Sequence, residues 1–102
     1  MGYVMKPTAQ QFRDSLAADR PPAHFDAPHL ALWRDAKGEW EQAHTCVDAL
    51  NDEPAIRVHA YLHRKEGDFA NAAHWYRRVG RTAPDQSLTA EFESLLNELL
   101  ET

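Results

Sequence analysis

The chain is poor in cysteine and glycine and lacks a long apolar run, and each of these features excludes a class of protein or site. It contains one cysteine, Cys46, among 102 residues, which excludes an internal disulfide and any zinc site built from paired cysteines. Its four glycines form neither a phosphate-binding loop nor a dinucleotide-binding pattern, and the G-x-S-x-G nucleophile motif is absent. No apolar run approaches the ~18 residues of a membrane-spanning helix. We therefore expect a cytoplasmic protein without a membrane segment or a cofactor, and no catalytic motif supports an enzyme.

Acidic residues outnumber basic ones, but the excess is unevenly distributed. The net charge of −5 disfavours contact with nucleic acid or anionic membranes. Residues 55–84 carry six basic and two acidic side chains, a local charge of +4, whereas the rest of the chain carries −9. Such a distribution favours a basic face that attracts an acidic partner.

The spacing of apolar residues predicts an all-α fold. Apolar residues recur at helical intervals, and no segment shows the strict alternation of a strand. We expect about six helices in a single domain, with Thr8 and Gln11 capping the first helix and Asp85 capping the last. The domain, 1–102, divides into an N-terminal leader with a short helix (1–27), a first hairpin (28–51), a second hairpin (54–84) and an amphipathic C-terminal capping helix (85–102).

The segment from Ile56 to Gly80 has the pattern of two helices joined by a tight turn. Gly67 suits the position that ends the first helix, and Asp68 can cap the second. At 100° per residue, one face of the first helix carries Ile56, His59, Ala60 and His63. One face of the second carries Phe69, Ala72, Ala73 and Tyr76. We expect these two faces to pack against each other.

Two parts of the chain resemble a known helical repeat. The run Gly67-Asp68-Phe69, followed by Ala72, Tyr76 and Pro84, resembles the second helix and closing proline of a tetratricopeptide repeat. A similar pattern occurs upstream as Gly38-Glu39-Trp40, then Ala43, Val47 and Leu50. The run H-A-Y-L-H-R-K-E-G-D also resembles small bacterial proteins. The tetratricopeptide resemblance implies antiparallel helical hairpins in a right-handed stack that act as a protein-interaction module.

The resemblance also implies where a partner would bind. In that family the first helix of each hairpin lines an inner groove, and the matching positions here are Arg57, Tyr61, Arg64 and Lys65. Arginine can hold a carboxylate through two parallel hydrogen bonds, so the expected partner is an acidic peptide or protein. The same residues could instead form a solvated helix face with charge pairs to the acidic remainder.

A histidine pair in the same segment suggests a different function. His59 and His63 lie one helical turn apart, a spacing at which two imidazoles can bind one metal ion, and Glu66 follows on a nearby face. A metal-binding protein or metal-dependent hydrolase using these three residues is therefore a second hypothesis. The sequence assigns no further ligand, and a histidine pair on an apolar helix face is more often a hydrogen-bonded part of the core.

The second helix of this hairpin carries its own basic cluster. His74, Arg77, Arg78 and Arg81 lie opposite the apolar face, and Trp75 is near enough to stack a nucleic-acid base. An RNA-associated factor is thus a third hypothesis, which the net negative charge disfavours. The alternative is a solvated face whose arginines pair with acidic residues of neighbouring helices.

The C-terminal segment has the strongest apolar stripe in the chain. It consists of Leu88, Phe92, Leu95, Leu96, Leu99 and Leu100, at helical spacing. An amphipathic terminal helix commonly covers the open apolar end of stacked hairpins. The alternative is a homodimer in which the Leu88–Leu100 stripe meets its symmetry mate.

Overall fold

The computed structural model describes residues 7–100, and within this range the fold is all-helical. These residues form six helices and no strand. The helices are α1 (Ala9–Ser15), α2 (Ala27–Ala36), α3 (Trp40–Val47), α4 (Glu53–Lys65), α5 (Phe69–Arg78) and α6 (Leu88–Leu99). The predicted fold class is therefore confirmed. None of the described helices combines the length and apolar character needed to cross a membrane.

Local sequence signals set the ends of several helices. The Thr8 hydroxyl accepts a hydrogen bond from the Gln11 amide at 3.0 Å, and the Gln11 side chain accepts one from the Thr8 amide at 2.9 Å. This is the predicted capping box. Gly67 has a φ of +90°, a left-handed conformation that suits glycine at the end of α4. Asp68 then caps α5 by accepting from the Asn71 amide at 3.2 Å.

The start of the last helix differs from the prediction. Ser87 caps α6, because its hydroxyl accepts a hydrogen bond from the Ala90 amide at 3.0 Å. The expectation that Asp85 serves as this cap is wrong. Ser87 directly precedes Leu88, the first residue of the apolar stripe, so capping there starts the helix where its buried face begins.

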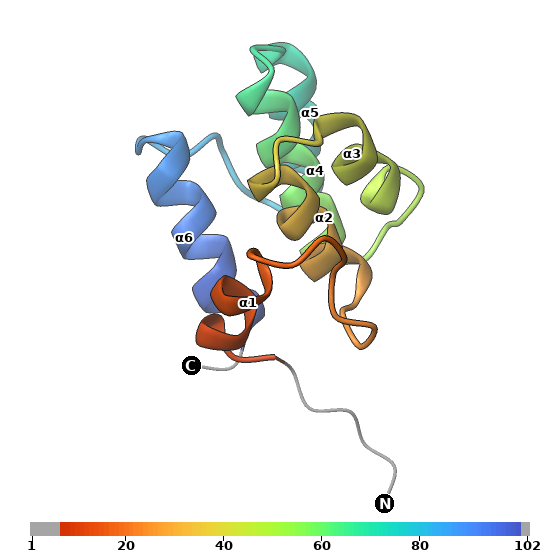
Figure 1. Ribbon diagram of the computed structural model, residues 1–102. Helices are drawn as coiled ribbons and strands as arrows, with labels where there is room; N and C mark the ends of the chain where they lie inside the picture. The colour runs from red at the N-terminus through yellow and green to blue at the C-terminus, as the bar shows by residue number, and fades with distance from the viewer. Residues whose placement is uncertain (1–6, 101–102) are drawn as a thin grey trace, which may run out of the picture.

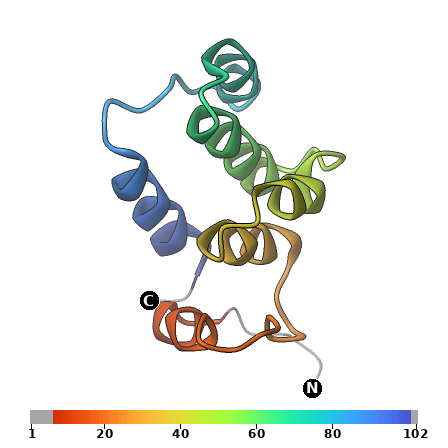
Figure 2. The same cartoon turned by 45° about the horizontal axis from the view of Figure 1, so that its top comes forward.

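Four of the six helices form two hairpins, and α6 lies across both. Helix α2 packs against α3, α4 packs against α5, and the hairpins meet where α4 contacts both α2 and α3. Helix α6 lies across α2 and α4 (Figures 1 and 2). In both views α5 lies at one end of the molecule and α1 at the other. The C-terminal helix therefore covers a face that the first helices of both hairpins share.

Most buried apolar side chains belong to one core. Its largest fully buried members are Trp33, Phe12, Leu32, Leu62, Leu95, Leu96, Val47 and Val58. A smaller cluster between α4 and α5 contains Ala60, Ala72 and Tyr76, three of the eight residues predicted to pack between these helices. Phe69 is not one of them, since it is 68% exposed. Helix side chains lean toward the N-terminus, so a side chain at the first position of α5 projects beyond the end of that helix.

The leucine stripe of α6 is directed into the protein. Leu95 and Leu96 are each 1% exposed, and Leu99 and Leu100 are also buried in the main core. Leu88 and Phe92 are partly buried against the same core. A homodimer through the Leu88–Leu100 stripe is therefore not what the structure indicates, because burial within one chain has already removed this apolar surface from water.

Candidate metal centre

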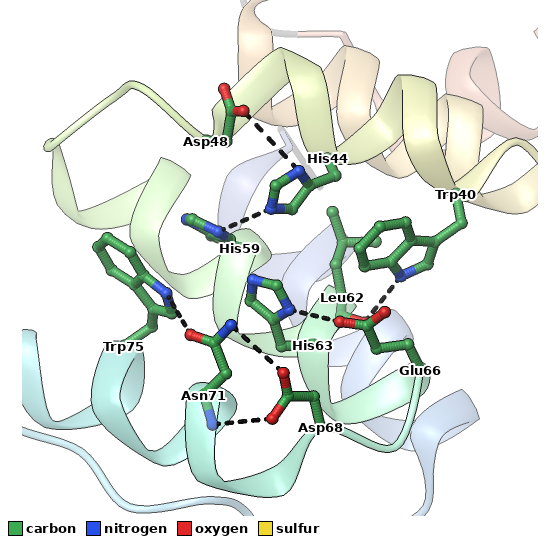
Figure 3. Close-up of polar contacts among 10 residues, drawn as sticks. All are labelled: Trp40, His44, Asp48, His59, Leu62, His63, Glu66, Asp68, Asn71 and Trp75. Atoms are coloured by element: carbon green, nitrogen blue, oxygen red, sulfur yellow. Dashed lines mark hydrogen bonds and ion pairs between the residues drawn. The ribbon is translucent and has the colours of Figure 1, made fainter.

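Helices α3 and α4 bring three histidines together. His59 and His63 lie on the face of α4 that meets α3, and His44 approaches them from α3 (Figure 3). The ring centroids are 4.7 Å apart for His44 and His59, 5.0 Å for His44 and His63, and 4.8 Å for His59 and His63. One ligand nitrogen from each ring can be chosen so that all three lie within 4.8 Å of one another. The structure thus supplies the third histidine that sequence reasoning left unassigned.

Two tryptophans flank the cluster. Trp40 stacks on His44 at 5.0 Å with an angle of 10° between the rings, and its indole N–H donates to the carbonyl of Leu62 at 2.8 Å. On the opposite side, Trp75 stacks on His59 at 4.3 Å (Figure 3). Each indole is half-buried and forms a wall of the histidine site. They restrict the orientations of the two imidazoles that they cover.

The position of Trp75 is fixed by a short polar chain from the start of α5. Its indole N–H donates to Asn71 Oδ1 at 3.0 Å. The Asn71 side-chain amide in turn donates to Asp68 Oδ2 at 3.4 Å, and Asp68 also accepts from the Asn71 backbone. The turn residue that caps α5 is therefore connected to the stacking partner of His59.

Carboxylates lie on the outer side of two of the imidazoles. Glu66 Oε2 is 2.7 Å from Nδ1 of His63, and Asp48 Oδ2 is 3.8 Å from Nδ1 of His44. A carboxylate at Nδ1 favours the tautomer whose Nε2 carries the free lone pair. Nε2 of His44 already lies 3.0 Å from Nε2 of His59. Glu66 thus holds His63 as an outer carboxylate holds a metal-binding histidine, whereas Asp48 lies beyond hydrogen-bond distance of His44.

His59 is the most deeply affected member of the cluster. It is 3% exposed, and its Nδ1 is buried without a hydrogen-bond partner among the described residues. Burial, followed by the neighbouring imidazoles of His44 and His63, lowers the pKa of His59 to about 4. The ring is therefore neutral at physiological pH, which is the form that binds metal ions.

The ligand set differs from the one expected from the sequence. His59 and His63 are together as predicted, but the third member of their group is His44, not Glu66. Glu66 instead contacts His63 from outside, and forms with His63 and Asp68 a second group that shares only that histidine. One signal for His44 was present: it follows Trp40 by four residues, so both side chains share a face of α3.

The expected peptide-groove residues bind groups of their own chain. Arg57 pairs with Glu98, and Arg64 pairs with Glu91 at 2.9 Å and with the carbonyl of Gln86. Helix α6 carries both of these carboxylates and lies on the face where a peptide was expected.

The other two groove candidates share one buried carboxylate. Asp35 is 4% exposed, accepts the Tyr61 hydroxyl at 2.8 Å and pairs with Lys65 at 2.7 Å. Burial and the adjacent carboxylate raise the pKa of Tyr61. Because Tyr61 itself is buried, it offers no surface to a partner. All four predicted groove residues are therefore bonded to groups of their own chain, although Lys65 stays partly exposed.

The predicted basic ridge on α5 has a different environment. His74, Arg77, Arg78 and Arg81 are all exposed. Arg78 lies over the ring of Trp75 at 5.1 Å from its centroid, and His74 contacts the same ring edge-on. His74 and Arg78 of this ridge therefore lie on the surface next to Trp75, a wall of the histidine site.

No known protein family, curated protein or solved structure matches the chain. The tetratricopeptide resemblance accordingly stays a prediction from the sequence. Function is inferred from the geometry of the histidine cluster.

Proposed function

We propose that this protein binds one transition-metal ion through His44, His59 and His63. The observation that carries the proposal is the convergence of three imidazoles whose ligand nitrogens lie within 4.8 Å of one another. Nε2 of His59 lies 3.0 Å from Nε2 of His44, so two of the three rings already direct a ligand nitrogen toward the same point.

The donor set indicates which ions fit. Three neutral imidazoles suit Zn²⁺, Cu²⁺, Ni²⁺ or Co²⁺, whereas Mg²⁺ and Ca²⁺ prefer oxygen ligands. Two nitrogens that bind Zn²⁺ at ~2.0–2.1 Å in a tetrahedron lie roughly 3.3 Å apart. His44 and His59 already meet this requirement at 3.0 Å, and small rotations of the third ring would complete the set. Three protein ligands leave one coordination position for water or another small ligand.

A purely structural histidine cluster is the competing interpretation. In it, His44 and His59 share one hydrogen bond and His63 bonds Glu66, with no ion involved. This interpretation gives no reason for three imidazoles to face one another between two indoles, a feature that metal binding explains.

Metal titration of untagged, chelator-treated protein tests the proposal. We expect one equivalent of Zn²⁺ by calorimetry, and Co²⁺ should give the visible absorption of a four-coordinate site. His44→Ala and His59→Ala should each weaken binding at least ~100-fold, since each removes one of three ligands. His24→Ala is the matched control, because His24 is exposed and lies outside the cluster. Less than a tenth of an equivalent of bound metal, or equal affinity in the His59 variant, would refute the proposal.

The open coordination position has a test of its own. Addition of azide to the Co²⁺-loaded protein should change its visible spectrum, because an exogenous anion can replace water at the fourth position. An unchanged spectrum at saturating azide would show that the position is closed, and would limit the site to a structural role.

A further inference from the structure

Helix α5 lies at one end of the molecule (Figures 1 and 2). It packs against α4 through Ala72 and Tyr76, and the Tyr76 hydroxyl also donates to Glu91 of α6, while the opposite side of α5 carries exposed residues. The residues exposed on or beside this helix include His74, Arg77, Arg78 and Arg81, here called the α5 face.

The arginines of the α5 face differ from most other arginines in the protein. Four arginines elsewhere form ion pairs with carboxylates of the chain, namely Arg13, Arg34, Arg57 and Arg64. Arg77, Arg78 and Arg81 form none within the described part of the chain. Residues 69–84 contain no acidic side chain that could compensate them. The α5 face therefore keeps an uncompensated positive charge on a protein whose net charge is −5.

We propose that the α5 face is a docking surface for an acidic segment of a partner protein. Three exposed guanidinium groups supply hydrogen-bond donors in the fork geometry that matches carboxylates. Arginine side chains are also among the types that dominate binding at interfaces. This surface is separate from the three histidines, so the proposal does not depend on metal binding.

Nucleic acid fits the α5 face less well than an acidic peptide. A phosphate backbone would extend past this short helix over a body in which the residues outside 55–84 carry −9. The aromatic ring that could stack a base is also engaged, because Trp75 stacks on His59 and Arg78 lies over the ring. A short acidic segment needs only the α5 face itself.

Fluorescence anisotropy with a labelled peptide of alternating Glu and Leu blocks tests this inference, with full-length protein in low salt. We expect binding that weakens at least fivefold between 20 and 300 mM NaCl, because exposed charges are screened by salt. Arg78→Glu should weaken binding at least fivefold. The matched control is Arg20→Glu, which makes the same charge change at an exposed arginine without an ion pair among the described residues, and it should change affinity less than twofold.

Three further measurements keep the inference open to refutation. A Lys/Leu peptide of the same length should not bind. Equal losses in the Arg78 and Arg20 variants would mean that net charge, and not the α5 face, attracts the peptide. Tighter binding of a single-stranded oligonucleotide than of the acidic peptide, lost in Arg78→Glu, would replace the proposal with a nucleic-acid site. Loss of metal binding in His59→Ala with peptide binding intact would separate the two proposals.

Discussion

Acidification should destabilise the metal-free protein through His59. The pKa of this ring is about 4 in the folded state and ~6.5 in an unfolded chain. Below pH ~6.5 His59 binds a proton in the unfolded chain, whereas in the folded protein it stays neutral until the pH approaches 4. The free energy of unfolding therefore decreases as the pH is lowered across this window. The linkage relation gives a loss of about 2 kcal/mol between pH 7.5 and 5, and about 3 kcal/mol in full.

The charged and titratable groups around His59 support this direction. The imidazoles of His44 and His63, and more weakly His74, oppose a positive charge on the ring, while Asp48 partly favours it. Burial opposes the charge more than any of them. Protonation would therefore place an unpaired cation in the cluster.

Urea denaturation in the presence of a chelator measures the effect. The wild type should lose about 2 kcal/mol more stability than His59→Leu between pH 7.5 and 5, since leucine does not titrate. His24→Gln should behave as the wild type, because His24 is exposed. A histidine NMR titration of the wild type provides a direct check. Equal pH dependence in the wild type and His59→Leu, or a measured pKa of His59 above 6, would refute the reasoning.

Three other substitutions test the fold. Glu91→Ala should cost about 3 kcal/mol in urea denaturation, because it leaves Arg64 and Tyr76 without their shared buried carboxylate; a loss below 1 kcal/mol would contradict this. Gly67→Ala should cost about 1–2 kcal/mol in thermal unfolding through its φ of +90° alone, since an added methyl group would meet no atom within 4 Å. Phe69→Ser should change the free energy of unfolding by less than about 0.5 kcal/mol, and a larger loss would show that this exposed ring packs in the folded protein.

Features that depend on near neighbours in the chain were predictable. The capping box of Thr8 and Gln11 and the turn at Gly67 and Asp68 follow from contacts over a few residues. Helical periodicity identified the all-α class in the same way. The error at Asp85 shows the limit of such signals, because two capping residues stand close together and the position of the buried stripe decides between them.

The pairing of charged side chains was not predictable. Arg57 and Arg64 lie on a face of α4 that a helical wheel assigns to solvent, yet they bind Glu98 and Glu91 of α6. These partners are 41 and 27 residues away in sequence. Only the packing of α6 across α2 and α4 brings them together, and the same packing buries the leucine stripe that could otherwise form a dimer.

The histidine site was likewise predictable only in part from the sequence. The sequence by itself determined that His59 and His63 share a helix face, because one turn of an α-helix fixes their separation. The tertiary structure alone decided that His44 joins them and that Trp40 and Trp75 enclose them, because these side chains come from α3 and α5. Spacing along a single helix is set by backbone geometry, whereas the approach of a third ligand depends on how separate helices pack.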